Sequence, residues 1–164
     1  MQSNTEQSNR SGILIASGFL IGTGLSGFVD GILLHEILQW HHMFTGLRPA
    51  VNLPNIEINT LGDGIFHAAN WIITVIGISL LWRAGGNKAV AWSSKIFVGS
   101  ILIGAGLFDV VEGIIDHQIL GIHHVKAGPN ELAWDIGFLI FGATVAVIGW
   151  LLLQSGKKET SVQL

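Results

Sequence analysis

The sequence predicts an all-α fold, a four-helix transmembrane bundle made of two tandem helical hairpins. The chain has 164 residues, of which 49% are hydrophobic and 12% are charged. An ordinary soluble domain is about 25% charged. The chain also holds four apolar stretches close to the length of about 20 residues that a membrane-spanning helix needs. Its first half resembles its second half when His35 is aligned with His117. Together these observations predict paired membrane helices.

The four predicted spans follow one another through short connections. We expect a single transmembrane domain at 12–153, with spans at about 13–43, 63–82, 95–125 and 131–153. Pro49 and Pro54 mark the loop after the first span, and Pro129 marks the loop after the third. The polar segment 1–11 is expected to be a disordered tail, and 154–164 a second tail.

The distribution of lysine and arginine predicts the orientation of these spans. Only Arg48 and Lys126 fall on the side of the predicted membrane that carries most of the histidines. The opposite side carries Arg10, Arg83, Lys88, Lys95, Lys157 and Lys158. Basic residues favour the cytoplasmic side. Both tails are therefore expected in the cytoplasm, and the histidine-bearing ends should face outward.

Composition limits the partners and the chemistry. The chain contains no cysteine, which excludes disulfides, thiolate metal sites and thiol catalysis. It has no basic patch of the kind that binds nucleic acid. The expected partner is the lipid bilayer, with a homo-oligomer or a membrane complex as further possibilities.

The internal repeat centres on histidine. Six of the seven histidines lie in two stretches, 28–42 and 110–124, which read FVDGILLHEILQWHH and VVEGIIDHQILGIHH. Alignment of the two stretches on their histidines places identical residues at many positions between 18 and 46. The second helices match more weakly, in an alignment that pairs Asp63 with Glu131 and His67 with Asp135. We interpret this as duplication of a hairpin, with a pseudo-two-fold axis along the membrane normal.

Helical spacing predicts which side chains meet. His35 and His42 are seven residues apart, as are His117 and His124, so each pair shares one helix face. The same faces carry glycines that allow close helix approach: Gly24, Gly27 and Gly31 in the first copy, Gly106 and Gly113 in the second. We therefore expect the first and third helices to pack on these glycines, with His35 and His117 facing inward.

The expected site has three levels near the outer face. His35, His117, His67 and Asp135 form one layer, with a contribution from each helix. A wetter layer above it contains Asp63, Glu131, His42 and His124, and Asp30 and Glu112 lie deeper in the membrane. Histidine and carboxylate without sulfur form the ligand set of iron, copper(II) or zinc. The prediction is a mono- or dinuclear metal site for redox chemistry or metal handling.

Three alternatives stay open at this point. Histidines and carboxylates can pair only with each other in a structural or assembly subunit without metal. A b-type haem could take His35 and His117 as axial ligands, although a glycine face leaves little room for a macrocycle. A proton path is disfavoured because the polar groups occupy only the outer half of the spans. The sequence leaves open whether His41 and His123 have a role, and it does not decide whether the protein is an enzyme.

The two histidine stretches also carry a family resemblance. With the residues around them they resemble small bacterial integral membrane proteins grouped as domain of unknown function twenty-two forty-three, over nearly the whole chain apart from its tails. The resemblance implies a four-span protein of the bacterial inner membrane. It implies no catalytic residues.

Overall fold

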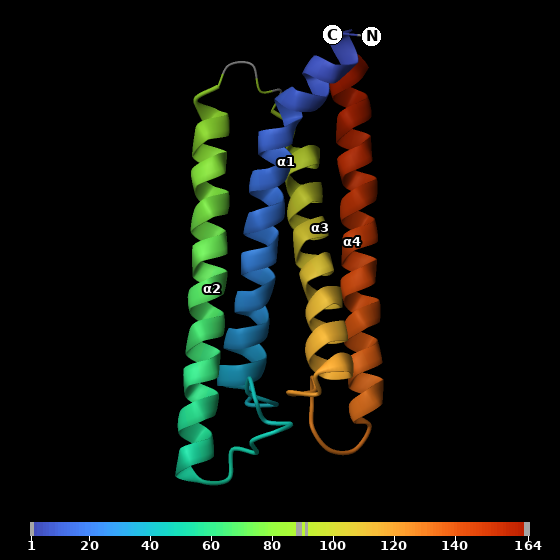
Figure 1. The fold of residues 1–164 in the computed structure, drawn as a ribbon. Helices are drawn as coiled ribbons and strands as arrows, with labels where there is room; N and C mark the ends of the chain where they lie inside the picture. Colours follow the sequence, from blue (N-terminus) through green and yellow to red (C-terminus); the bar gives the residue numbers. More distant parts are fainter. Residues whose placement is uncertain (1, 88–89, 91, 163–164) are drawn as a thin grey trace.

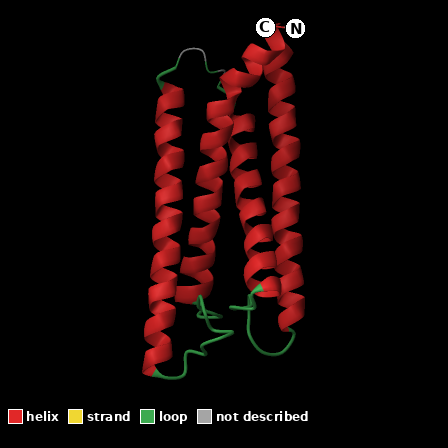
Figure 2. Cartoon of the chain, in the orientation of Figure 1, coloured by secondary structure: helices red, strands yellow, loops and turns green. Residues whose placement is uncertain are grey.

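Helices make up most of the protein in the computed structural model, which describes residues 2–87, 90 and 92–162 (Figure 2). Helix α1 covers Gln2–Val29 and continues into the π-helix η1, Asp30–Ile37. Helix α2 covers Leu53–Gly85. Helix α3 covers Ser94–Glu112 and continues into the π-helix η2, Gly113–Ile119, and α4 covers Glu131–Val162 (Figure 1). The predicted all-α fold with four long helices is confirmed.

Four segments are long and apolar enough to cross a membrane: Ser11–Ile37, Leu53–Gly85, Ser94–Ile119 and Glu131–Ser161. Helix α2 begins at Leu53, earlier than the expected Asp63, because the side chain of Asn52 caps it by accepting a hydrogen bond from the Asn55 amide. Ser93 caps α3 in the same way through the Ile96 amide. Helices α1 and α4 also extend into the segments expected to be tails.

The helices stand side by side in the order α2, α1, α3, α4 (Figure 1). Helix α1 packs on α2 and α3, and α3 packs on α4, while α2 and α4 do not touch each other within the described residues. The four helices therefore form a row that is not closed by contact between the outer helices α2 and α4. Large apolar side chains of these helices, such as Trp71 and Phe141, are exposed on the surface.

Two groups of glycines set the helix spacing. A Cβ atom on Gly22 would lie 2.0 Å from the Ile101 carbonyl oxygen, and one on Gly104 would lie 2.0 Å from the Phe19 carbonyl oxygen. These glycines bring α1 and α3 into contact. For the second group of glycines, the predicted contact between the first and third helices was wrong. Its members Gly24, Gly27 and Gly31 face α2, and Gly106 and Gly113 face α4.

The first and third membrane helices end earlier than expected, at Ile37 and Ile119 instead of about 43 and 125. The Leu38 amide donates to the Leu33 carbonyl and the Leu120 amide donates to the Ile115 carbonyl, both over 2.8 Å. The chain then turns at a residue with positive φ, Gln39 at 48° in one case and Gly121 at 57° in the other. Each turn ends the helix and directs the following histidine pair back toward the bundle.

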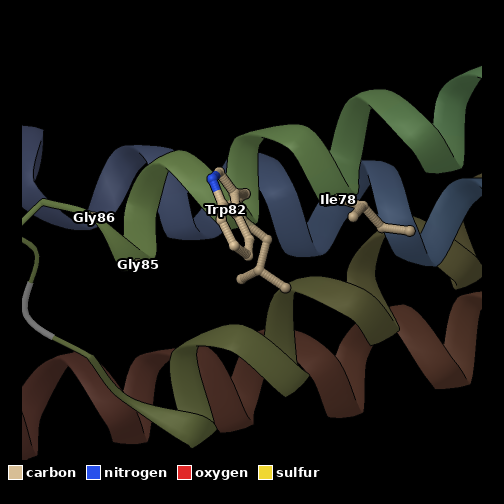
Figure 3. Close-up of a pocket in the computed structure, with 5 residues that line it drawn as sticks. Ile78, Trp82, Gly85 and Gly86 are labelled. Atoms are coloured by element: carbon tan, nitrogen blue, oxygen red, sulfur yellow. The ribbon is translucent and has the colours of Figure 1, made fainter.

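Basic residues mark the end of the bundle opposite the histidines. Arg83 lies in the last turn of α2, Lys95 lies in the first turn of α3 and pairs with Glu159 of α4, and Lys157 lies toward the end of α4. Both chain termini lie at this end of the bundle (Figure 1). Lys88, also expected there, lies outside the described residues. A shallow apolar pocket near this end is lined by residues of α2, including Ile78 and Trp82 (Figure 3). Trp82 is the amphipathic side chain expected at a membrane boundary.

Candidate metal centre

The candidate centre lies where the segments after η1 and η2 meet at one end of the bundle (Figure 1). Four histidines are buried there: His35, His41, His117 and His123. The rings of His41 and His123 stack, with centroids 4.5 Å apart and planes 6° from parallel. Two segments far apart in the sequence therefore share one buried cluster.

In the first half of the site, His35 lies between two carboxylates. Its Nε2 is 3.2 Å from the Asp30 Oδ2 atom, one π-helical turn earlier on η1. Its Nδ1 is 2.7 Å from the Oδ1 atom of Asp63 on α2. The Phe66 ring stacks on the imidazole with a centroid distance of 5.7 Å. Packing and hydrogen bonding thus hold the ring with Nε2 toward the cluster.

The second half has the same arrangement around His117. Its Nε2 is 3.2 Å from the Glu112 Oε1 atom, and its Nδ1 is 3.5 Å from the Asp135 Oδ1 atom. The Phe138 ring lies 5.6 Å from the imidazole. Glu112 also reaches the Nε2 of His123, at 3.0 Å. The longer side chain of Glu112 therefore contacts two histidines, whereas the Asp30 Oδ1 atom is 3.9 Å from the His41 Nε2 atom.

Backbone carbonyls orient the two stacked rings. Nδ1 of His41 donates to the Val125 carbonyl over 2.8 Å, and Nδ1 of His123 donates to the Met43 carbonyl over 3.1 Å. A carbonyl oxygen can only accept, so each Nδ1 carries the proton. Burial, together with the neighbouring His123 and His35 rings, lowers the pKa of His41 to about 2. His41 is therefore neutral at neutral pH, with a lone pair on Nε2.

The inward-facing atoms form two overlapping ligand groups. One consists of His35, His41 and His123, and the other of Glu112, His117 and His123. Within each group, one ligand atom per residue lies within 4.8 Å of the others, and every member is buried. His123 belongs to both. Several of the inward atoms have no hydrogen-bond partner: the Nε2 atoms of His35, His41 and His117, Oδ2 of Asp30 and Oε2 of Glu112.

Other predicted site residues surround these groups. Asp63 accepts from the Met43 amide and lies 2.8 Å from Nδ1 of His42, while Asp135 accepts from the Val125 amide and lies 2.7 Å from Nδ1 of His124. His42 and His124 are partly exposed, and Glu131 touches His124 at 3.5 Å. These five residues form an outer shell that positions the backbone and the ligand rings.

Among the described residues, His67 belongs to neither ligand group. Its ring contacts the rings of Phe28 and Phe66, and its Nε2 lies against Gly31, where a Cβ would be 2.2 Å away. The expected layer of His35, His117, His67 and Asp135 is therefore only partly assembled.

The expectation missed His41 and His123, which are 3% and 2% exposed. It assumed a continuous α-helix, on which His42 and His124 share the face of His35 and His117. The π-helices and the turns after them bring the preceding histidine inward instead. Gly121, which lies between His117 and His123, was the signal in the sequence that could have predicted such a turn.

Comparisons with other proteins place the chain in a family. No curated protein and no solved structure matches it. The resemblance carried by the two histidine stretches is confirmed: a family model described as predicted membrane protein (DUF2243) matches residues 17–156, and the chain belongs to this family of membrane proteins.

Proposed function

We propose that this protein holds a dinuclear transition-metal centre near the outer face of the bacterial inner membrane. The observation that carries the proposal is a set of buried ligand atoms that make no hydrogen bond: three histidine Nε2 atoms and two carboxylate oxygens. Buried polar atoms without hydrogen bonds are rare in native proteins. Metal ions bound at the three Nε2 atoms and at Asp30 would satisfy most of this set, and Oε2 of Glu112 would keep a lone pair for a further donor.

The protonation pattern supports the same conclusion. Metal-ligating histidines usually donate their other ring N–H to a carboxylate or a backbone carbonyl. Three of the four buried histidines, His35, His41 and His123, have such an acceptor hydrogen-bonded at Nδ1, at distances from 2.7 to 3.1 Å, while Nδ1 of His117 lies 3.5 Å from Asp135 without a hydrogen bond. When the His123 ring is neutral, its Nε2 presents a lone pair to the Glu112 Oε1 atom 3.0 Å away. A cation between or beside these two atoms removes the repulsion.

Charge balance favours bound cations. Asp30, Asp63, Glu112 and Asp135 are buried around the four histidines, and Asp109 is buried as well. Carboxylates without a compensating positive charge are expensive to bury in a membrane protein, and divalent cations would supply that charge. A set of nitrogen and oxygen ligands suits iron, copper(II) or zinc. Iron or copper makes the centre redox-active, and zinc makes it a Lewis acid that activates water.

The two ligand groups belong to a parallel internal repeat, which we infer from contacts that recur between equivalent residues of the two halves. Gly22 meets the Ile101 carbonyl and Gly104 meets the Phe19 carbonyl. His41 bonds to Val125 as His123 bonds to Met43. In the second helices, Asp63 takes the place of Asp135, whereas the sequence alignment paired Asp63 with Glu131.

The orientation in the membrane follows from the basic residues. Arg83, Lys95 and Lys157 lie at the end opposite the histidines, and basic residues favour the cytoplasm. Both termini are therefore cytoplasmic, and the metal centre faces outward.

Two other candidates fit the contacts less well. A b-type haem needs space between its axial histidines, but His41 and His123 stack at 4.5 Å and lie beside both His35 and His117. In a subunit held together by charged histidine–carboxylate pairs without metal, each paired ring carries a proton on Nε2. His41 cannot contribute such a pair, because burial keeps its ring neutral.

Metal analysis of the purified, membrane-extracted protein tests the proposal. We expect about two ions per chain, as in other dinuclear helix-bundle sites. His35→Ala and His117→Ala should each lose metal, because each removes a member of one ligand group. His67→Ala is the control and should keep the wild-type content. A folded wild-type protein that contains no metal and takes up none overturns the proposal.

A further inference from the structure

An apolar groove leads from the lipid-facing surface to the proposed metal ligand Glu112. It is lined by residues of α1, α2, α3 and η2, among them Phe19, Phe66, Leu107 and Phe108. The rings of Phe66 and Phe108 lie side by side, with centroids 6.1 Å apart. The same groove is lined at one end by two carboxylates, Glu112 and Asp116.

Both carboxylates have unused hydrogen-bonding capacity. Glu112 is 7% exposed, and its Oε2 atom has no partner. Asp116 is half-buried on η2 within a membrane span. Among the described residues, no hydrogen bond or ion pair reaches the Asp116 carboxylate. An ionisable side chain in such a place is costly and usually functional. Hydrocarbon chains of lipid cannot satisfy these oxygens, whereas a hydrogen-bond donor in the groove can.

Two residues that line the groove differ from their counterparts in the first half of the sequence. When the two copies are aligned on their histidines, Ser26 takes the place of Phe108. In the same alignment, Leu34 takes the place of Asp116. The first half therefore lacks both the extra phenyl ring and the extra carboxylate. Helix packing alone does not require Phe108 and Asp116 to differ from Ser26 and Leu34, their counterparts in the first half.

We propose that this groove binds a lipid-soluble hydroxyaromatic molecule, with its ring against Phe66 and Phe108 and its hydroxyl groups donating to Glu112 and Asp116. Aromatic rings favour aromatic neighbours in offset or edge-to-face contact. A hydroxyl group forms a stronger hydrogen bond with an ionised carboxylate than with a neutral acceptor. The inference deepens the proposed function, because Glu112 would connect the bound molecule to the metal centre.

The test is equilibrium binding of a decyl-substituted para-benzoquinol to the full-length protein in lipid nanodiscs. We expect saturable binding. The dimethoxy analogue has the same ring and chain but no O–H donor, and it should bind about tenfold or more weakly, as expected for the loss of hydrogen bonds to charged groups.

Three variants test where the quinol binds. Leu107→Trp fills the groove and should weaken quinol binding at least tenfold. Leu25→Trp is its matched control, because Leu25 is the equivalent residue of the first copy and has similar exposure, 46% against 43%. It should leave binding unchanged. Asp116→Leu introduces the residue found at position 34 and should weaken quinol binding about tenfold.

The outcomes separate the two proposals. Absence of saturable binding, equal binding of the dimethoxy analogue, or equal effects of the two tryptophan variants overturns the groove assignment. Preferential binding of a dodecyl ammonium ion overturns it as well, in favour of a cationic ligand. Metal content is measured on every sample. If the protein binds quinol but takes up no metal, the groove assignment stands and the metal centre is overturned. If the protein has normal metal content but binds no quinol, the metal centre stands and the groove assignment is overturned.

Discussion

Nδ1 of His41 donates to the carbonyl oxygen of Val125 over 2.8 Å, so a ring that follows the first membrane helix is held by backbone that follows the third. The reciprocal bond, from His123 to Met43, is 3.1 Å long. These two bonds join the halves of the protein at the place where the ligand groups overlap. The site is therefore complete only when the two halves of the protein are in contact.

The shared histidine should be the most sensitive ligand. His123 is the residue common to both ligand groups, and its Nε2 can ligate one ion of either group, so His123→Ala should lose metal, whereas His42→Ala should retain most of the metal because His42 only supports Asp63. Metal content per folded chain measures the difference. Similar losses in the two variants would contradict a ligand role for His123.

The outer carboxylates should tune metal affinity without determining the number of ions. Asp63→Asn weakens the acceptor for Nδ1 of His35. Losing such a partner lowers metal affinity by about 10–100-fold, so competition with a chelator should show a shift of that size at unchanged saturation. Glu36→Gln is the control: Glu36 is exposed, and glutamine occupies the equivalent position 118. A shift of equal size in both variants would remove the special role of Asp63.

Acid should destabilise the metal-free protein through His41. Its folded-state pKa of about 2 lies below the ordinary 6.5. The unfolded ring binds a proton below pH 6.5 while the folded ring does not, so the stabilising contribution is present above that pH and is lost as pH falls. One such ring changes the free energy of unfolding by about 1.4 kcal/mol per pH unit.

This effect is measured by denaturation of chelator-treated protein in detergent at a series of pH values between about 7.5 and 5. The His41→Asn variant should show a shallower loss of stability than wild type, and His42→Asn should keep the wild-type slope. Equal slopes in the wild type and the His41→Asn variant would rule out a neutral, buried His41.

Close packing of α1 on α3 should make Gly22 intolerant of any side chain. Gly22→Ala places a Cβ 2.0 Å from a backbone carbonyl oxygen that cannot move independently. Overpacking of this kind destabilises by about 1–3 kcal/mol, and separation of the helices would also disturb the metal centre. Thermal unfolding should show a lower midpoint for Gly22→Ala. Gly64→Ala, whose Cβ meets nothing within 4 Å, should be neutral or slightly stabilising.

Much of this architecture could be predicted from the sequence because membrane helices have strong signals. Apolar length located the four spans, and the recurrence of Asp30 and His35 as Glu112 and His117 identified two of the four buried histidines. The partner helix of each glycine could not be predicted. Glycines on several faces of α1 are compatible with contact to either neighbour, and only the assembled packing decides between α2 and α3.

The rest of the site depended on local backbone geometry. Seven-residue spacing holds only on an α-helix, and the chain leaves that geometry at Asp30 and Gly113. The positive φ at Gln39 then places His41 inside and His42 at the rim. Hydrophobic periodicity carries no information about such a turn. Similarly, only the tertiary contacts show that Asp63 and Asp135 are equivalent, because each contacts the buried histidine of its own half. The sequences of the second helices are too different for an alignment to reveal this.

The most direct test of the central claim is anomalous X-ray scattering from crystals of the metal-loaded protein, recorded at the absorption edge of the bound metal. The dinuclear centre predicts two peaks per chain among the inward Nε2 atoms of His35, His41, His117 and His123, one in each ligand group. Peaks confined to the partly exposed His42 or His124, or no peak in a folded protein, would contradict it.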